Sequence, residues 1–437
     1  MTDFSADEIF KRLEVMDNPR KRAEKSAESG ARKPWHALLL LTSTKSPRPL
    51  LANAVIALRE AEEWKAALRY DEFSLEIKIR RAPPWIDDPK DYPERAWNAS
   101  DDLMLANWLQ HEGVCVQPKV AAQAVEIVAR DVPFHPVKDY LDGLEHDGKP
   151  RVGDWLSRIF GAEKTPYTRE IGRAILIGAV ARIYRPGCKV DTVPIFEGEQ
   201  GAKKSTAIKA LFGPWFTDEL ADLGSKDASM QVRGVWGVEL AELDAMSRGE
   251  ISKIKAFISR TIDRFRPPYG ERLIESLRSC VFWGSTNKDD YLKDETGGRR
   301  FWPIKTGKIK IDLLIAERDQ LWAEAVALYN KGTAWWITTD EIQADAEQQQ
   351  RDRYVGDPWQ DKIGDFLATR QETTVADILL QCIGIEVGRC GQVEMNRVSR
   401  CLQFYKWKKV RETTGTRKWK YVRPDAPNLQ VIEGGRK

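Results

Sequence analysis

The stretch Gly198-Glu-Gln-Gly-Ala-Lys-Lys-Ser-Thr206 is the most informative part of the chain, because it nearly matches a nucleotide phosphate-binding loop. The apolar segment 191–197 before it is typical of a buried strand, and residues 205–212 after it are predicted to be helical. In this order, backbone N–H groups and a helix N-terminus face phosphate oxygens. Lys204 would reach the outer phosphates of a triphosphate, and the Ser205 hydroxyl would hold Mg²⁺. The predicted triphosphate site comprises Gly198, Gly201, Lys203, Lys204, Ser205 and Thr206.

Lys203 departs from the general motif, which has Gly directly before the Lys. A Gly at this place can take a positive φ at no cost, whereas a Lys is strained there unless the local turn is right-handed. A second ammonium near the phosphates would offset part of that cost. The alternative interpretation of the stretch is a surface turn, rich in Gly and Lys, between a strand and a helix.

The composition describes a soluble globular protein of 437 residues, with 42% hydrophobic and 31% charged residues, and predicts two or three domains. The net charge is only +3, so any affinity for nucleic acid must come from local basic patches. No apolar run approaches the roughly 20 residues of a membrane span. Six cysteines without a CxxC pair and four scattered histidines indicate neither a zinc site nor a disulfide framework, which predicts a cytoplasmic location.

Four regions are predicted from the pattern of apolar residues. Residues 191–305 alternate strands and helices, as a parallel α/β sheet does, and the long apolar helix 168–184 before them suits burial beside that sheet. The predicted units are a mixed N-terminal α/β region (1–130) that begins with a charged helix to about Lys33, a helical region (131–190), the α/β core (191–355) and a C-terminal unit (356–437). In the first unit, residues 50–67, 101–111 and 119–130 are predicted helices and 73–79 a strand.

Two further strands carry polar groups at their ends. The apolar segment from Gly234 delivers Glu239, Glu242 and Asp244, which would face the metal and the attacking water if the strand lies beside the phosphate loop. The alternative is an ordinary strand that runs into an acidic loop. A third strand, 279–287, ends in Asn287, whose amide could bind the γ-phosphate or its water.

The segment Thr296-Gly-Gly-Arg-Arg-Phe-Trp-Pro303 places Arg299 and Arg300 on a turn before another apolar segment. An arginine presented in this way can reach a phosphate, including one bound by a neighbouring subunit, and stabilise the transition state of phosphoryl transfer. The alternative is a pair of solvated loop arginines. The order of the motifs along the chain, rather than the arginines themselves, favours the functional interpretation.

This order of motifs resembles the virulence-associated E family, ATPases of phages and mobile elements that are similar to superfamily 3 helicases and phage primase-helicases. The resemblance covers about residues 130–305. It also includes His135-Pro-Val-x-x-Tyr-Leu141, Asp147-Gly-x-x-Arg151, Ala179-Val-Ala-Arg182, Pro186-Gly187, Lys255-Ala-Phe257, Asp263-Arg-Phe-Arg266-Pro-Pro-Tyr-Gly270 and Leu292-Lys-Asp294. Lys203 in place of Gly is the departure from the family pattern, and it bears on the efficiency of hydrolysis.

The resemblance implies a P-loop ATPase core of the AAA+ or superfamily 3 kind, with residues 131–190 as a helical collar and with ATP and Mg²⁺ as cofactors. Lys204 and Ser205 would bind phosphate and metal, Glu242 would orient the water with Glu239 near the metal, and Asn287 would sense the γ-phosphate. Arg299 or Arg300 would act in trans across a ring interface. In superfamily 3 helicases the segment between the second and third motifs carries a hairpin that contacts single-stranded DNA in the channel; the basic residues here are Lys255, Arg264, Arg266 and Arg272.

The last eighty or so residues read as three helices, 359–370, 375–383 and 393–404, followed by two short strands, which is the layout of a winged helix. Gly415 would lie in the turn between the strands. Basic residues alternate with Trp407, Trp419 and Tyr421, which suits a nucleic-acid backbone, duplex DNA included. The predicted DNA contacts are Arg397, Arg400, Lys408, Lys409, Arg417 and Lys418. The alternatives are a basic hairpin that docks on the ATPase and a winged helix that binds protein.

The function these features favour is an ATP-dependent DNA helicase or translocase of a phage, prophage or other mobile element, in the cytoplasm of a bacterial host. It would act as a ring of six subunits in DNA replication, with a primase or another replication protein as partner. One alternative is a regulatory, origin-recognition or loader ATPase that binds DNA without unwinding it. Another is a nucleotide switch with hydrolysis weakened by Lys203. Residues 1–130 show no carboxylate cluster that would indicate primase activity.

Overall fold

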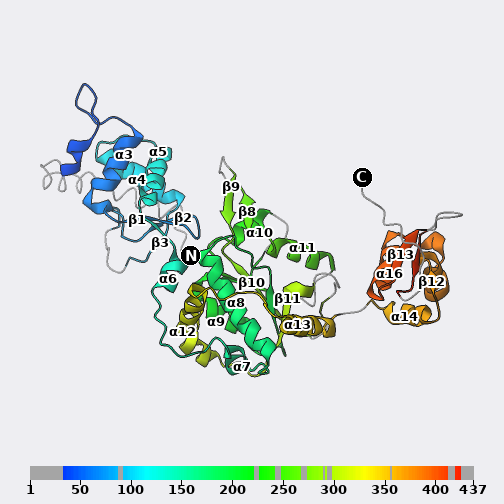
Figure 1. Ribbon diagram of the computed structural model, residues 1–437. Coiled ribbons are helices and arrows are strands. Elements are labelled where there is room, and N and C mark those ends of the chain that lie inside the picture. The colour runs from blue at the N-terminus through cyan, green and yellow to red at the C-terminus, as the bar shows by residue number, and fades with distance from the viewer. Residues whose placement is uncertain are drawn as a thin grey trace.

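The computed structural model describes residues 33–86, 92–220, 226–241, 248–266, 273–288, 291–292, 298–354, 357–411 and 419–424 (Figure 1). The charged helix predicted before Lys33 lies outside the described residues, as do Gly415 and the segment Pro267–Gly270. Within these ranges, no helix has both the length and the apolar character needed to traverse a bilayer.

A five-stranded sheet in the order β11-β5-β10-β7-β6 forms the centre of the fold. Every neighbouring pair in it is parallel, which confirms an α/β fold with a parallel sheet. All side chains of β5, β7 and β10 are buried, as expected for strands covered on both faces. The strands are β5 (Val193–Glu197), β6 (Phe216–Thr217), β7 (Gly237–Leu240), β10 (Val281–Thr286) and β11 (Phe301–Lys305).

Helices cover both faces of this sheet, and alternate residues of one strand belong to different cores. On β5, Phe196 packs in the cluster formed by α8, α9 and α12, whereas Ile195 packs in the cluster formed by α10 and α11. The prediction of a long helix buried beside the sheet is confirmed by α8, in which a Thr165 capping box fixes the N-terminus. These helices are α8 (Pro166–Tyr184), α9 (Lys204–Phe212), α10 (Lys226–Gln231), α11 (Arg248–Ile258) and α12 (Ile311–Asn330).

Four tryptophans of this region are core residues. Trp236, Trp283, Trp302 and Trp322 are all buried. The indole N–H of Trp236 donates to the Ala179 carbonyl oxygen at 2.9 Å, and that of Trp322 donates to the Leu211 carbonyl oxygen at 3.1 Å. Each large apolar ring thus also satisfies its polar atom, which is the condition for burying a tryptophan at low cost.

The N-terminal unit has its own core and a four-stranded sheet in the order β3-β2-β1-β4. The predicted strand 73–79 is correct only in its second half, because residues 72–75 form the turn between β1 and β2. That turn contacts the main core: the Gly234 N–H donates to the Phe73 carbonyl oxygen at 3.2 Å, and Phe73 packs in the α8 cluster. The elements are α3 (Leu51–Glu60), β1 (Leu68–Asp71), β2 (Glu76–Ile79), β3 (Arg95–Ala96), α4 (Ala99–His111), α5 (Pro118–Arg130) and β4 (Pro133–Phe134).

The C-terminal unit contains the three predicted helices and the predicted pair of strands around a separate apolar cluster. A two-residue strand, β12, adds to the pair and gives the antiparallel order β12-β14-β13. The elements are α14 (Gln360–Ala368), β12 (Glu372–Thr373), α15 (Val375–Asp377) continued by a π-helix (Ile378–Ile383), α16 (Gln392–Phe404), β13 (Lys408–Arg411) and β14 (Trp419–Val422).

Shorter elements complete the described chain. A two-stranded hairpin, β8 (Ile262–Phe265) and β9 (Ile274–Leu277), lies between α11 and β10 and extends from the core (Figure 1). The remaining helices are α6 (Pro136–Asp142), α7 (Trp155–Ile159), α13 (Asp340–Asp352) and the 3-10 turns Pro34–Leu38, Glu62–Trp64, Gly213–Trp215, Gly298–Arg300 and Val387–Arg389.

Replacing Gly237 by Ala should destabilise the core, because a Cβ at this place on β7 would overlap the ring of the buried Phe212. We expect a loss of about 1–3 kcal/mol in the free energy of unfolding, the usual cost of overpacking. Denaturant unfolding measures it. Gly153→Ala is the matched control, since nothing lies within 4 Å of its Cβ. Equal stabilities for the two variants would contradict this close packing.

Candidate functional site

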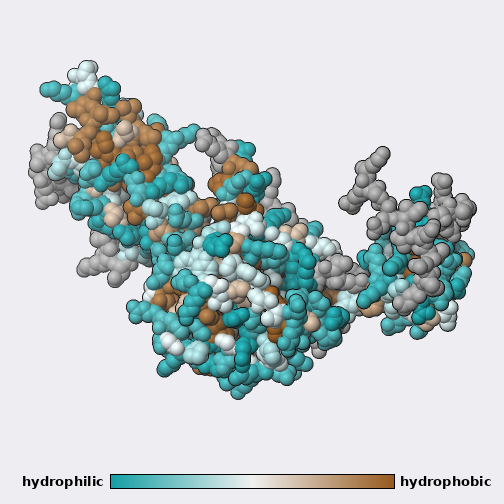
Figure 2. Space-filling model, viewed as in Figure 1, coloured by the Kyte–Doolittle hydropathy of each residue, from teal (hydrophilic) through white to brown (hydrophobic). Residues whose placement is uncertain are grey.

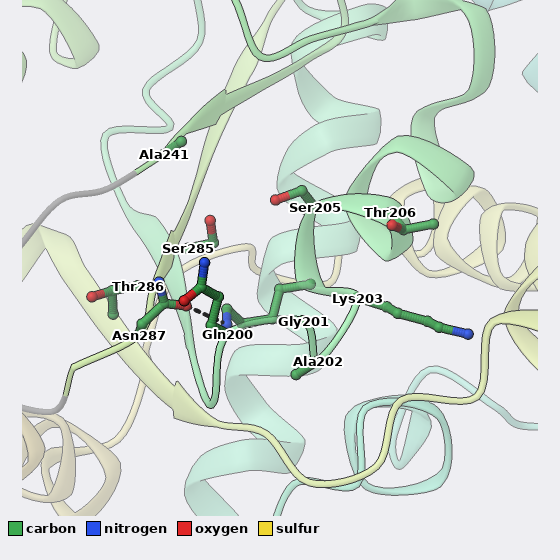
Figure 3. Close-up of a pocket in the computed structure, with 11 residues that line it drawn as sticks. Gln200, Gly201, Ala202, Lys203, Ser205, Thr206, Ala241, Ser285, Thr286 and Asn287 are labelled. Atoms are coloured by element: carbon green, nitrogen blue, oxygen red, sulfur yellow. Dashed lines mark hydrogen bonds between the residues drawn. The ribbon is translucent and has the colours of Figure 1, made fainter.

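Three adjacent strands end at one cavity. β10 pairs with β5 on one side and with β7 on the other, so the carboxyl ends of all three meet at the same edge of the sheet. The cavity there has a volume of about 360 Å³, in the range of small-molecule sites. It is lined by Gln200, Gly201, Ala202, Lys203, Lys204, Ser205, Thr206, Ala241, Ser285, Thr286 and Asn287 (Figure 3).

The loop between β5 and α9 takes two left-handed backbone conformations. Gly201 has a φ of +82°, and Lys203, directly before the helix, has a φ of 64° and a ψ of 27°. Lys203 therefore occupies the conformation that glycine adopts freely and that costs an L-residue about 1–2 kcal/mol. Its side chain extends away from Ser285 and Asn287 (Figure 3), so the expected compensation by a second ammonium at the phosphates is not seen in this conformation.

Side chains packed against Glu197 and Gly198 fix the start of the loop. A Cβ on Gly198 would lie 2.6 Å from the Thr306 hydroxyl oxygen, which itself donates to the Glu197 carbonyl oxygen at 2.7 Å. The buried carboxylate of Glu197 is bound by the guanidinium of Arg353 and by the Tyr291 hydroxyl at 2.8 Å. These contacts leave room only for glycine at position 198 and fix where the loop leaves the sheet.

Lys204 connects the loop to the neighbouring strand. Its ammonium donates to the carbonyl oxygens of Gly198 at 2.8 Å and Glu199 at 2.9 Å, and to Asn287 Oδ1 at 3.0 Å. Desolvation lowers the pKa of Lys204, and the charge of Glu239 opposes that shift. Since an ammonium has three protons, all are used, and an incoming phosphate would take the place of at least one of these acceptors.

One carboxylate oxygen of Glu239 accepts hydrogen bonds from two serine hydroxyl groups, and the other oxygen accepts none from the described residues. Its Oε1 accepts from Ser205 Oγ at 2.7 Å and from Ser285 Oγ at 2.6 Å. Its Oε2 is buried and has no hydrogen-bond partner among the described residues, which is costly for a carboxylate oxygen. A carboxylate oxygen and a serine hydroxyl side by side are oxygen ligands that fit Mg²⁺, which keeps several waters of its own. Glu242, the predicted water-orienting residue, and Asp244 lie outside the described residues.

The two candidate arginines differ in their surroundings. Arg300 is partly buried; its Nε donates to Ser259 Oγ at 3.1 Å and lies 3.7 Å from Asp191 Oδ2. Arg299 is exposed and makes no hydrogen bond or ion pair with the part of the chain that the structure describes. The geometry therefore favours Arg299 over Arg300 as the arginine that could reach another molecule.

The comparison with protein families agrees with these motifs. Residues 141–355 match the family described as virulence-associated protein E-like domain. This segment is a virulence-associated protein E-like domain. It begins within α6, contains the whole parallel sheet and ends just after Arg353, which binds Glu197 at the base of the loop.

Solved structures similar to the chain include two of the NrS-1 C terminal region. The apo structure of residues 305–718 has 12% sequence identity and a TM-score of 0.45, over 81% of this chain and 95% of that one. The A form apo structure has 11% identity and a TM-score of 0.44, over 82% and 95%. No curated protein is significantly similar to the chain.

The predicted channel residues of the virulence-associated protein E-like domain have different exposures. Lys255 on α11 is 8% exposed, with its Nζ 5.7 Å from the centre of the Phe301 ring, so the prediction that it contacts DNA is not supported. Arg264 and Arg266 are exposed on β8 and just after it, and Arg264 pairs with Glu275 at 2.9 Å. Arg272 lies outside the described residues.

One predicted DNA contact of the C-terminal unit, Arg397, already has partners within the chain. Arg397 Nε donates to both carboxylate oxygens of Asp357 at 2.7 Å, and its guanidinium lies 3.9 Å from the centre of the Trp359 ring. It therefore fixes the start of this unit within the chain. Arg400, Lys408 and Lys409 are exposed, whereas Arg417 and Lys418 lie outside the described residues.

The aromatic residues of this unit are not equivalent. Trp407 and Tyr421 are buried in its core, but Trp419 is 53% exposed. Lys409 Nζ lies 4.9 Å from the centre of the Trp419 ring, and the Arg411 guanidinium lies 5.7 Å from it. One aromatic face between two cations is thus presented on the β13–β14 pair.

Sequence reasoning missed Ser285 and Gln200, which line the cavity, and the pair Glu197–Arg353 behind the loop. Ser285 had a signal, since Ser285 and Thr286 are polar residues directly before Asn287, at the end of an apolar run. Arg353 had none, because it is 156 residues from Glu197 in the sequence.

Lys203→Gly should stabilise the protein by about 1 kcal/mol, because glycine accepts the left-handed conformation without the Cβ clash. Denaturant unfolding measures the change. Lys209→Gly is the matched control: the same replacement within α9 should destabilise by about 0.5–1 kcal/mol. A Lys203→Gly protein as unstable as Lys209→Gly would show that the strain is absent.

Proposed function

We propose that this protein is an ATP-dependent DNA helicase or translocase of a phage, prophage or other mobile element, and that it works as a ring in DNA replication. The observation that carries the proposal is the pair of contacts at adjacent strand ends, Lys204 with Asn287 and Ser205 with Glu239. This is the arrangement of a cation, a metal-binding hydroxyl, a carboxylate and a polar amide that a magnesium-bound triphosphate needs. The family match over residues 141–355 supports it.

The residues would divide the work as follows. The Lys204 ammonium would leave a carbonyl oxygen of the loop and bind the outer phosphates, and the loop N–H groups before α9 would bind the others. Ser205 and Glu239 would hold Mg²⁺, which supplies neutralisation of the phosphate charge when bound. Asn287 would contact the γ-phosphate or the attacking water, and Glu242 would orient that water. In this reading the loop is a P-loop and the core is of the AAA+ or superfamily 3 kind.

The exposed arginine supports the proposed ring. Arg299 is the exposed member of the pair and would reach the triphosphate of a neighbouring subunit, where it would stabilise the charge of the transition state. Six subunits is the number we propose. The hairpin β8–β9, with Arg264 and Arg266, would contact the backbone of single-stranded DNA, in a manner independent of sequence and sensitive to salt.

Lys203 favours a second candidate function. Its strained conformation weakens the loop in comparison with one that has glycine, so the protein could bind nucleotide as a switch with slow turnover. ATP binding without DNA-stimulated hydrolysis would identify the switch. Strand displacement on a forked duplex separates a helicase from a loader that hydrolyses ATP without unwinding.

The ring site predicts complementation between inactive variants. Arg299→Ala and Glu242→Ala should each lose DNA-stimulated ATP hydrolysis, by about 10³-fold or more for Arg299→Ala. Mixed together they should regain turnover, because some interfaces then combine an intact Arg299 with an intact Glu242. Lys204→Ala is the inactive reference and Arg300→Ala the control for the arginine turn. Absence of turnover in the mixture would count against a shared site.

We also propose that the C-terminal unit is a winged helix that binds DNA through β13, β14 and Trp419. Replacing Lys408, Lys409 and Arg411 by Ala should weaken binding to duplex DNA and reduce the slope of log affinity against log salt by about 2–3, because each phosphate contact contributes about 0.9. Fluorescence anisotropy at several salt concentrations measures the slope. Lys362→Ala with Arg389→Ala is the control for charge, and an unchanged slope in the triple variant would place the DNA elsewhere.

A further inference from the structure

The hairpin β8–β9 needs support at its base. Among the described strands, β8 and β9 pair only with each other, in a register that places Ile262 opposite Leu277 and Phe265 opposite Ile274. A two-stranded ribbon of this length is marginally stable in water without further packing. Its position in the fold therefore depends on what holds its base, where β8 begins and β9 ends.

A buried ion pair occupies this base. Arg278, directly after β9, donates from Nε to Asp263 Oδ2 at 2.8 Å and from Nη2 to Asp263 Oδ1, and its Nη1 donates to the Phe257 carbonyl oxygen. The Arg278 side chain is 0% exposed and that of Asp263 is 4% exposed. The two parallel hydrogen bonds fix the angle between the charged groups as well as their distance. β8 and the chain after β9 are thus joined by side chains in addition to their backbone ladder.

The backbone of Arg278 joins the same base to α8. Its carbonyl oxygen accepts from the Gly187 N–H at 2.9 Å and from Arg182 Nη1 at 3.2 Å, and its N–H donates to the Thr261 carbonyl oxygen at 2.9 Å. Gly187 has a φ of +80°, and a Cβ there would lie 3.1 Å from the Thr261 carbonyl oxygen. The sequence motifs with Arg182, Gly187 and Asp263, which the nucleotide site does not use, therefore meet at one residue.

The base of the hairpin and the cavity share one strand. Only two residues, 279 and 280, separate Arg278 from β10, and β10 carries Ser285 and leads directly to Asn287. β10 pairs with β7 at residues 281–284 and with β5 at residues 284–286, so each of its residues is held by a neighbouring strand. Arg278 also binds the last turn of α11, the helix that follows β7 in the chain. A shift of Asn287 along β10, or of α11 after β7, would therefore reach the hairpin through the same ion pair.

We propose that Arg278 and Asp263 are positioning residues that couple the hairpin to the nucleotide site. The inference rests on the proposed function, in which the hairpin contacts DNA and the cavity binds ATP. Replacing a buried ion pair is not costly in every protein, so stability alone gives little reason for this one. Its location, between the two proposed sites, gives a reason: the pair keeps the hairpin in a fixed orientation on β10, so that DNA and nucleotide alter each other's binding.

The test compares Asp263→Asn and Arg278→Lys with Glu275→Gln, which removes the exposed ion pair of the same hairpin. We expect the first two variants to keep ATP turnover without DNA within about twofold of the original protein. The ratio of turnover with DNA to turnover without DNA should be about tenfold in the original protein and should fall towards one in these variants. Glu275→Gln should keep the stimulation. The coupling role is wrong if both buried-pair variants retain the stimulation by DNA. It is also wrong if, in both variants, ATP turnover without DNA and the melting temperature fall along with the stimulation.

A second measurement does not depend on hydrolysis. Hydrogen exchange of the β8 and β9 amides, with and without a non-hydrolysable ATP analogue, should show nucleotide-dependent protection in the original protein and in Glu275→Gln, and none in Arg278→Lys. Absence of DNA-stimulated turnover in the original protein would defeat the proposed function, while this protection would still support the coupling. Protection that is unaffected by Arg278→Lys would overturn the coupling and leave the proposed function in place.

Discussion

The hydrogen bonds of the Lys204 ammonium are the constraint on which the rest of the site depends. They join the loop after β5 to Asn287 at the end of β10, and they are possible only because these two parallel strands are neighbours in the sheet. The ammonium is buried, so its charge must be matched by fixed acceptors or by a ligand. The hydrogen bond from Ser205 to Glu239 joins the start of α9 to β7, the strand on the other side of β10. The order of the strands in the sheet brings these groups together, and the helices packed on its two apolar faces hold the strands in place.

Much of the core could be predicted from the sequence, because its strands are apolar runs bounded by turn residues and α8 is apolar on most sides. The short elements could not. β3, β4 and β12 have two residues each, too few for a periodic pattern. β8 reads Ile-Asp-Arg-Phe, in which a buried aspartate takes a place that the pattern assigns to a surface residue. Only the tertiary partner, Arg278, makes that burial reasonable.

The site residues that were predicted are those whose place follows from a strand end. Lys204, Ser205, Glu239 and Asn287 come together in the structure because their strands are adjacent. The predicted DNA contacts of Lys255 and Arg397 depend on exposure, which the sequence does not give: Lys255 on α11 lies beside the Phe301 ring, and Arg397 on α16 binds Asp357. Charge in a sequence indicates a surface, but it does not say which charges are already neutralised within the chain.

We propose that a magnesium-bound triphosphate occupies the cavity at these strand ends. Isothermal titration of a non-hydrolysable ATP analogue, with Mg²⁺ and with EDTA, tests it most directly when the original protein is compared with Glu239→Gln. We expect one site per chain, with an affinity that depends on Mg²⁺ in the original protein and does not depend on it in the variant. Binding that is equally tight with EDTA, or equally dependent on Mg²⁺ in both proteins, would contradict it.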